Sequence, residues 1–203
     1  MAKKNFIKKK RILLSRIVIA ALGVFIILSD SKWENIGIWS TVFFLAGVVL
    51  VGTATIGRLW CSIYISGYKS ETLITEGPYS LCRNPLYFFS FLGAAGVGLA
   101  AETLLIPLFI IVFFLIYYPF VIREEQKRLL KIHGESFEQY CRTTPVFWPS
   151  LKSFKEPEQY PVNARIYRKS LFDALWFVWL VGLLELIEAF HECGLVPVLI
   201  KIY

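Results

Sequence analysis

The feature that most constrains this chain is an uninterrupted run of apolar residues. Residues 36–57 contain no charged side chain, and a helix of this length crosses the roughly 30 Å hydrocarbon core of a bilayer. Hydrophobic residues make up 56% of the 203-residue chain, and charged residues only 18%. A soluble domain of this size cannot bury so much apolar surface. The sequence therefore predicts an integral membrane protein with helical spans.

Three further apolar stretches predict four more spans. Residues 12–28 carry only Arg16, and we interpret them as a retained transmembrane helix, with a secretory signal peptide as the alternative. Residues 86–122 would form a helix of about 55 Å, nearly two bilayers, so we expect a helical hairpin that turns at residues 101–103. Residues 171–190 contain three carboxylates and form the fifth block. Together the blocks predict an all-α bundle of about five transmembrane helices in one integral membrane domain, residues 1–203.

The basic residues predict the orientation of the bundle. Of the 22 Lys and Arg residues, 19 lie before the first span or in the segments that join span two to three and span four to five. The positive-inside rule places such segments in the cytoplasm, together with the amino terminus. Because the charges flank apolar spans and form no separate basic domain, we expect no nucleic-acid partner. The sequence does not predict an oligomeric state.

The first cytoplasmic segment with an unusual composition is residues 71–87. Its Gly77-Pro78 pair marks a turn, and Asn84-Pro85 marks a second turn that starts the next helix with Pro at its first position. These turns would bring three side chains to the cytoplasmic end of the third span: Tyr79, Arg83 and Tyr87. Tyr and Arg also anchor helices at headgroup depth, and composition alone slightly favours such an interfacial belt.

The second segment, residues 123–140, continues the fourth span as a charged helix that we expect to stop at Gly134. Glu124 and Glu125 lie less than one turn past the predicted membrane edge, beside Arg123. A solvated helix stabilised by ion pairs is one interpretation. Acidic groups at this depth, facing a loop rich in Tyr and Arg, could equally hold a polar ligand.

Other residues that could carry chemistry favour structural interpretations. The four cysteines and two histidines show no metal-ligand spacing, so no metal site is predicted. The glycines of the third span are expected to let helices pack closely: Gly93, Gly96 and Gly98. Near the end of the last block, three carboxylates lie on one helical face with the spacing i, i+3, i+7: Glu185, Glu188 and Glu192, with His191 beside Glu188. We expect these side chains to reach the outer membrane interface. An intramembrane function is the alternative.

The two segments together resemble the isoprenylcysteine carboxyl methyltransferase and phospholipid methyltransferase superfamily. The first family signature, Gly-x-Tyr and then Arg-(His or Asn)-Pro-x-Tyr, is similar to residues 77–79 and 83–87. The second is an acidic pair, then Gly-x-x-aromatic-x-x-Tyr and a Pro. It is similar to Glu124-Glu125, Gly134, Phe137, Tyr140 and Pro145. The resemblance covers about residues 36–150 as a methyltransferase-like core, and leaves residues 160–203 as a carboxyl-terminal extension.

The resemblance implies S-adenosylmethionine (S-adenosyl-L-methionine) as methyl donor, bound at the cytoplasmic face without a Rossmann fold. The acceptor would be a lipid or a hydrophobic small molecule, either like an isoprenylcysteine carboxylate or like a phospholipid amine. Ten positions match cofactor-binding residues of the family: Glu71, Thr72, Leu73, Ile74, Tyr79, Asn84, Pro85, Leu86, Tyr87 and Glu125. The candidates for catalytic roles are Arg83, Arg123 and Glu124. Where some members carry a substrate-binding Arg, this chain has Val121, and Arg123 is the candidate substitute.

Two other functions stay open. Sterol and steroid reductases have somewhat similar helical hairpins and use NADPH as the hydride donor. A non-enzymatic membrane scaffold or transport subunit would use Arg83 and Glu125 only as helix anchors. Titration with the two cofactors separates these functions, because only the methyltransferase is expected to bind S-adenosylmethionine.

Overall fold

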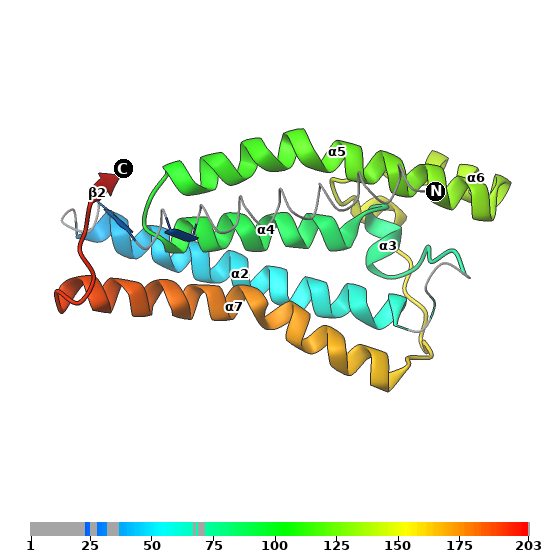
Figure 1. Cartoon of the computed structure of the whole chain (residues 1–203). Helices are drawn as coiled ribbons and strands as arrows, with labels where there is room; N and C mark the ends of the chain where they lie inside the picture. The colour runs from blue at the N-terminus through cyan, green and yellow to red at the C-terminus, as the bar shows by residue number, and fades with distance from the viewer. Residues whose placement is uncertain (1–22, 25–27, 32–36, 67, 69–71, 203) are drawn as a thin grey trace, which may run out of the picture.

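A computed structural model describes residues 23–24, 28–31, 37–66, 68 and 72–202 of the chain. In this part of the chain, four long helices lie side by side in an elongated bundle (Figure 1). They are α2 (Ile38–Ile65), α4 (Pro85–Ala100), α5 (Leu105–His133) and α7 (Ala164–Glu192). Shorter helices are α3 (Pro78–Leu81), α6 (Glu135–Thr143) and the 3-10 helix η2 (Leu151–Ser153). The predicted first span lies almost wholly outside the described residues.

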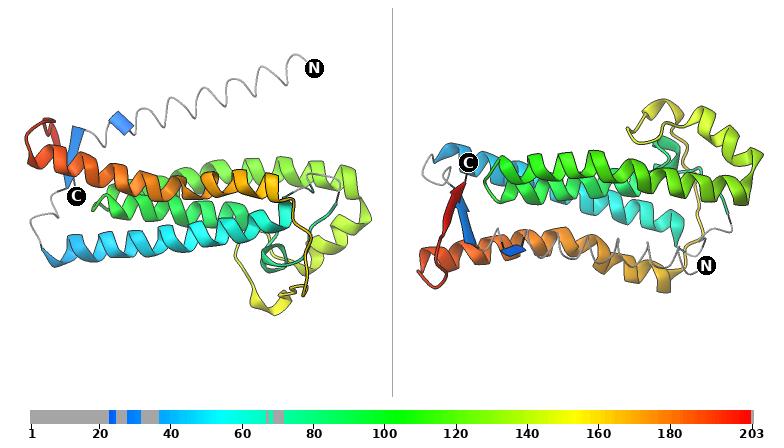
Figure 2. Two further views of the ribbon diagram at one scale, coloured as in Figure 1. Left: turned by 90° about the horizontal axis from the view of Figure 1, so that it is seen from below. Right: turned by 45° about the horizontal axis from the view of Figure 1, so that its top comes forward.

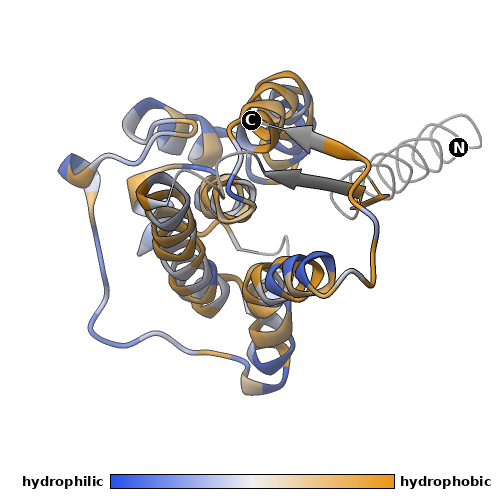
Figure 3. Ribbon diagram, turned by 90° about the vertical axis from the view of Figure 1, so that its left-hand side faces the viewer, coloured by the Kyte–Doolittle hydropathy of each residue, from blue (hydrophilic) through white to orange (hydrophobic). Residues whose placement is uncertain are grey.

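Three of the long helices, α2, α5 and α7, are long and apolar enough to cross a membrane, and α4 is a shorter apolar helix. Large hydrophobic side chains point outward along them, such as Val49, Ile56 and Leu115, each more than 60% exposed. Figure 3 shows mostly hydrophobic colour along the helical ribbons, with hydrophilic stretches on some helical turns and in one long connecting segment. Such a surface is stable only in lipid, so the chain is a membrane protein.

The predicted helical hairpin is confirmed. Helix α4 ends at Ala100 and α5 begins at Leu105, and Glu102 adopts a positive φ of 53° in the turn between them. Asn84 caps α4 and Pro85 occupies its first turn, as the sequence predicts. Helix α5 ends before Gly134, whose φ of 52° suits glycine at a helix end. Pro119 lies inside α5 without ending it.

Small residues let α2 and α4 approach each other closely. A Cβ atom on Gly47 would lie 2.6 Å from the Gly96 carbonyl oxygen, and one on Gly96 would lie 2.8 Å from the Gly47 carbonyl oxygen. Gly93 faces the ring of Phe177 in α7, and Gly98 faces Pro107 across the hairpin. The prediction that these glycines pack helices is therefore confirmed.

Among the described residues, the only regular secondary structure besides the helices is one short strand pairing, so the all-α class is confirmed. Strand β1 (Ser29–Ser31) runs parallel to β2 (Ile200–Ile202), with Asp30 opposite Lys201. The pairing closes the end of the bundle that holds the turn between α4 and α5 (Figure 2). Helices α3, α6 and η2 lie at the opposite end. We call that end the motif end and define it as residues 72–87 and 118–155.

Candidate functional site

The first motif turn is built around Gly77. Its φ of 57° lies in the region that favours glycine, and a Cβ atom there would collide with the ring of Tyr64 in α2. The Gly77 amide donates to the Lys155 carbonyl over 2.7 Å, and the Ser80 hydroxyl donates to the Gly77 carbonyl over 2.7 Å. The turn is thus fixed between α2 and the segment that follows η2. Pro78 can then start α3, which carries Tyr79.

Tyr140 joins the two motif segments directly. Its hydroxyl donates a 2.6 Å hydrogen bond to the Tyr79 carbonyl oxygen, and its side chain is buried. Burial raises the pKa of the Tyr140 phenol and also that of Tyr79. Both phenols therefore stay neutral at physiological pH, and Tyr140 remains a hydrogen-bond donor.

The residues before α4 are tied to the chain after α6. The Arg83 amide donates to the Pro145 carbonyl over 2.8 Å, and the Asn84 side-chain amide donates to the Val146 carbonyl over 2.8 Å. The Arg83 guanidinium donates through Nη1 to Cys141 Sγ, whereas its Nε is buried and has no hydrogen-bond partner among the described residues. Asn84 therefore uses its NH₂ group to hold residue 146 in place. Arg83 keeps one buried donor for a further group.

Tyr87 begins an aromatic cluster between α4 and α5. Its ring meets the ring of Tyr118 edge to face, with centroids 5.1 Å apart, and Tyr118 stacks on Phe114. Pro85 is fully buried and Leu86 is half-buried. Both therefore pack at the start of α4 and do not face an open cavity.

The acidic pair at the end of α5 is divided between two environments. Glu125 is half-buried, while Glu124 and Arg123 are exposed on the helix surface. Within the described residues, Glu125 makes no hydrogen bond or ion pair that would hold its carboxylate for a structural purpose. Next to it, the side-chain nitrogen of Gln126 is buried and has no hydrogen-bond partner in the part of the chain that the structure describes. Unpaired buried groups of this kind are typical of binding sites.

A polar cavity of about 530 Å³ lies on one side of α6. It is lined by Leu73, from the predicted cofactor-binding loop, and by Tyr140, from α6. The other lining residues are mainly polar: Thr75, Ser80, Ser136, Gln139, Thr143, Thr144, Ser153 and Lys155. In the same loop as Leu73, Thr72 is exposed and Ile74 is half-buried. Glu71 lies outside the described residues.

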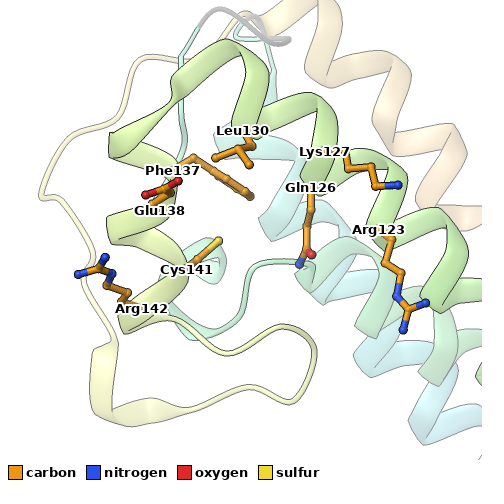
Figure 4. Close-up of a pocket in the computed structure, with 8 residues that line it drawn as sticks. All are labelled: Arg123, Gln126, Lys127, Leu130, Phe137, Glu138, Cys141 and Arg142. Carbon is orange, nitrogen blue, oxygen red and sulfur yellow. The ribbon is translucent and has the colours of Figure 1, made fainter.

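A second cavity, of about 490 Å³, lies on the other side of α6, between α6 and α5. Figure 4 shows Arg123, Gln126 and Lys127 extending from α5, and Phe137 and Cys141 from α6. The remaining lining residues are Leu130, Glu138 and Arg142. We call this space the cationic cavity, because three of its eight lining residues are Arg or Lys and one is acidic.

A third cavity, of about 380 Å³, lies beside α4 and α5, and we call it the apolar groove. Its wall is largely aromatic and includes Phe91, Phe114, Tyr118, Phe147 and Trp148. It shares Arg123 and Gln126 with the cationic cavity. The other residues that line it are Leu115, Pro119, Ile122 and Val146. Sequence analysis missed Tyr118, Gln126 and Trp148, although Tyr118 lies seven residues before Glu125 on the same helical face.

Arg58 is a further polar residue that sequence analysis did not select. It lies in α2, where its Nη1 donates to the Ser90 hydroxyl and its Nη2 donates to the Asp173 backbone carbonyl over 3.4 Å. The guanidinium also lies 5.5 Å from the centroid of the Phe177 ring. Its position directly after an uncharged block of 22 residues was the available signal.

The polar residues at the end of α7 lie away from these cavities. Glu185 and Glu192 are exposed, and Glu188 and His191 are half-buried. They occupy the end of the bundle opposite the motif end (Figure 1). Among the described residues, no group of three or more His, Cys, Asp or Glu side chains could hold a metal ion.

Comparison with known proteins gives one family and two curated relatives. The family model described as phospholipid methyltransferase matches residues 36–136. The cobalt-zinc-cadmium resistance protein CzcN of Cupriavidus metallidurans is 35% identical over 199 residues, which are 98% of this chain and 91% of the relative. The nickel-cobalt-cadmium resistance protein NccN of Alcaligenes xylosoxydans xylosoxydans is 35% identical over 193 residues, which are 95% and 90%. No solved structure matches the chain.

Proposed function

Because this chain belongs to the phospholipid methyltransferase family, within the integral membrane methyltransferases that resemble isoprenylcysteine carboxyl methyltransferase, we propose a specific reaction for it. The chain transfers a methyl group from S-adenosyl-L-methionine to a lipid or other hydrophobic acceptor. The reaction takes place at the motif end, on the cytoplasmic face of the membrane. Of the 22 basic residues, 19 support this orientation, and the first apolar block supports five spans in one domain.

One observation carries the proposal: the two motif segments are locked together at one end of the bundle. The Tyr140 hydroxyl holds the Tyr79 carbonyl, and the Arg83 amide holds the Pro145 carbonyl. These contacts join residues about 60 positions apart in the sequence. A scaffold that used Arg83 only as a helix anchor would not need this connection.

The residues at the motif end fit the chemistry of the methyl donor. A sulfonium cation is stabilised by aromatic faces, which Tyr87 and Tyr118 supply. A carboxylate suits the unpaired Nε of Arg83, and an ammonium group suits the half-buried carboxylate of Glu125. We propose that Leu73, with its neighbours Glu71, Thr72 and Ile74, completes the site from the loop side. In the same proposal Asn84, Pro85 and Leu86 set the position of Tyr87.

The bound donor supplies an electrophilic methyl group on a positively charged sulfur. The acceptor's electron pair forms the new bond to the methyl carbon, and the sulfur keeps the electron pair of the bond that breaks. The chain's own residues hold the two reactants in line and exclude water, which are the main sources of rate for such a displacement. A carboxylate acceptor needs no base. An amine acceptor would pass its proton to a carboxylate, for which Glu124 is the candidate, because Glu125 is proposed to bind the donor's ammonium group.

The names of the relatives suggest a setting for the reaction. Both are described as resistance proteins toward cobalt and cadmium, among other metals. We propose that this chain serves metal resistance by methylating a membrane component. In cells that depend on the chain for growth in cobalt or cadmium, we expect Glu125→Ala to abolish that growth. If cells that carry an inactive variant still grew in cobalt or cadmium, resistance would not depend on methyl transfer.

Donor binding is the direct test. We expect Glu125→Ala and Tyr87→Ala each to abolish calorimetric binding of S-adenosylmethionine and of its demethylated product, while far-ultraviolet circular dichroism stays unchanged. Glu158→Ala, an exposed carboxylate in the segment before α7, is the matched control and should keep wild-type affinity. Titration with NADPH examines the reductase alternative. Unchanged donor affinity in both variants, or binding of NADPH instead, would overturn the assignment.

A further inference from the structure

Helix α7 is covered less by the rest of the bundle than the other long membrane helices are. In its most apolar stretch 6% of the residues are buried, against 22% in α2 and in α5. Toward the bundle, Ala174 is buried and Phe177 packs against Gly93. The opposite side of α7 is exposed in the part of the chain that the structure describes.

That exposed side carries a regular row of large hydrophobic residues. At 100° per residue, its members share the side of the helix opposite Ala174 and Phe177. They recur at alternating steps of four and three residues, about 3.5 on average, which is the spacing of helices that pack along their whole length. We call this row the α7 stripe, and its members, each between 39% and 62% exposed, are Phe172, Trp176, Trp179, Leu183, Leu186 and Phe190.

Lipid chains alone do not satisfy the two indole groups of the stripe. Trp176 and Trp179 lie in the uncharged stretch 174–184, whereas Trp in membrane proteins is enriched at the interface, where its N–H meets polar groups. Neither indole N–H makes a hydrogen bond among the described residues. Because an unpaired donor in hydrocarbon costs free energy, we expect another segment to supply an acceptor beside the stripe.

The path of the chain brings one apolar segment to this helix. The Leu199 amide donates to the Leu28 carbonyl over 2.9 Å, and the pairing of β1 with β2 follows directly. Figure 2 shows both strands at the end of the bundle where α7 ends. Leu28 is the last residue of the first apolar block, residues 12–28, so the block is tied to the bundle at this end. As a helix the block would be about 25 Å long, and the α7 stripe is about 27 Å long.

The charges of the two segments are complementary. Arg16 is the only charged residue of the block, and Asp173 is the only charged residue between positions 170 and 184. Arg58 donates to the Asp173 backbone carbonyl, but the exposed Asp173 carboxylate has no ion pair among the described residues. A lone Arg and a lone Asp near hydrocarbon are each costly, and pairing lowers that cost.

We propose that residues 12–28 form a helix that packs along the α7 stripe and runs parallel to α7. The proposal places Leu28 level with Phe190. Arg16 then lies about 18 Å, and Asp173 about 25 Å, from that level toward the motif end. Because side chains of a helix point toward its amino terminus, the long Arg16 side chain reaches toward the Asp173 carboxylate. This packing does not depend on methyl transfer.

The same placement gives the indole groups polar neighbours. Ser15 lies about 20 Å from the level of Leu28, and Trp176 lies about 21 Å from it. The Ser15 hydroxyl is an acceptor for an indole N–H. The Arg16 guanidinium is attracted to the face of an indole ring, which is the best of the aromatic partners for a cation. Lipid chains offer neither interaction.

Photo-crosslinking in the full chain, reconstituted in lipid nanodiscs, tests the packing. Benzoylphenylalanine, introduced at one position of the block at a time, reacts on illumination with C–H groups that it contacts. We expect one or two neighbouring positions to give at least threefold more adduct on the peptide with residues 172–190 than the other positions do. Ile116, which is 64% exposed on α5, is the matched control and should give lipid adducts only. The test positions cover one helical turn: Val18, Ile19, Ala20 and Ala21.

The other possible occupants of the stripe give different adducts. Adducts on α5, adducts on a second copy of the chain, or lipid adducts alone at all four positions would each overturn the inference. Equal adduct yields on α7 from all four positions would also overturn it, because a packed helix presents one side to its neighbour.

A double-mutant cycle tests the charge pair without a crosslinker. Arg16→Gln and Asp173→Asn should each lower Tm in detergent, and the double variant should lose no more Tm than the larger single loss. Glu185→Gln removes a carboxylate of α7 that lies further from Arg16, so it is the matched control. Its loss should add to that of Arg16→Gln. If the losses of Arg16→Gln and Asp173→Asn added up instead, the proposed register and the packing that depends on it would be wrong.

Discussion

The hydrogen bond between Tyr140 and Tyr79 offers the sharpest test of how the motif end is assembled. Tyr140→Phe removes one hydroxyl group and leaves the ring in place. The hydroxyl oxygen lies 2.6 Å from the Tyr79 carbonyl oxygen, and the Tyr140 side chain is only 7% exposed. The variant therefore leaves a carbonyl without its donor in a place that water reaches poorly.

The expected loss of stability follows from that burial. Leaving a buried acceptor without its hydrogen bond costs about 1–3 kcal/mol. For a chain of 150–250 residues, each kcal/mol corresponds to roughly 2–4 °C in Tm, so we expect a decrease of roughly 2–12 °C. Because Tyr79 belongs to the proposed donor site, affinity for S-adenosylmethionine should also fall.

Thermal unfolding in detergent, followed by circular dichroism, measures the first effect, and calorimetric titration measures the second. Tyr167→Phe is the matched control, since the Tyr167 hydroxyl has no hydrogen bond among the described residues. If Tyr140→Phe changed neither Tm nor affinity relative to Tyr167→Phe, the two motif segments would not depend on this contact. The reasoning that carries the proposed function would then be refuted.

Two further predictions concern packing and pH. Gly47→Ala should destabilise the bundle by about 1–3 kcal/mol, because its Cβ would meet backbone atoms of α4 at 2.6 Å. Gly52→Ala, in the same helix with nothing within 4 Å of the added atom, should be neutral or stabilising in the same unfolding assay, and equal effects would argue against the close packing. Burial raises the pKa of Cys82 from 9.0 to about 11. The buried thiol therefore contributes stability below about pH 9 and loses it as pH rises toward 11. Wild type should lose more Tm than Cys82→Ala between pH 9 and 11, and parallel curves would contradict this linkage.

Much of the fold could be predicted because its signals are local. The hairpin turn, the start of α4 at Asn84-Pro85 and the end of α5 at Gly134 follow from charge, proline and glycine in neighbouring positions. The pairing of β1 with β2 could not be predicted, since it joins residues about 170 positions apart through backbone groups alone. No side-chain pattern in a three-residue strand records such a partner.

The sequence names candidate site residues as a prediction, but it does not give the surroundings in which the fold places each of them. Both Glu124 and Glu125 fit the acidic pair, yet only the structure shows that Glu125 is half-buried and Glu124 exposed. The motif predicts that Asn84 binds the cofactor, but its side-chain amide donates to the Val146 carbonyl, after α6. Helix α6 also separates the polar cavity from the cationic cavity, and this follows from the tertiary path of the chain. Residues that are adjacent in a motif can therefore line different cavities.

The extension beyond the family match is part of the same bundle. The match ends at residue 136, whereas the relative from Cupriavidus metallidurans aligns with 98% of the chain. Helix α7 packs Phe177 against Gly93, and Arg58 donates to the Asp173 carbonyl. An Arg side chain facing hydrocarbon costs several kcal/mol, so a bundle with Arg58 in α2 requires a polar or aromatic neighbour on that side. Helix α7 supplies both, through the Asp173 carbonyl and the Phe177 ring, so the extension completes the surroundings of Arg58.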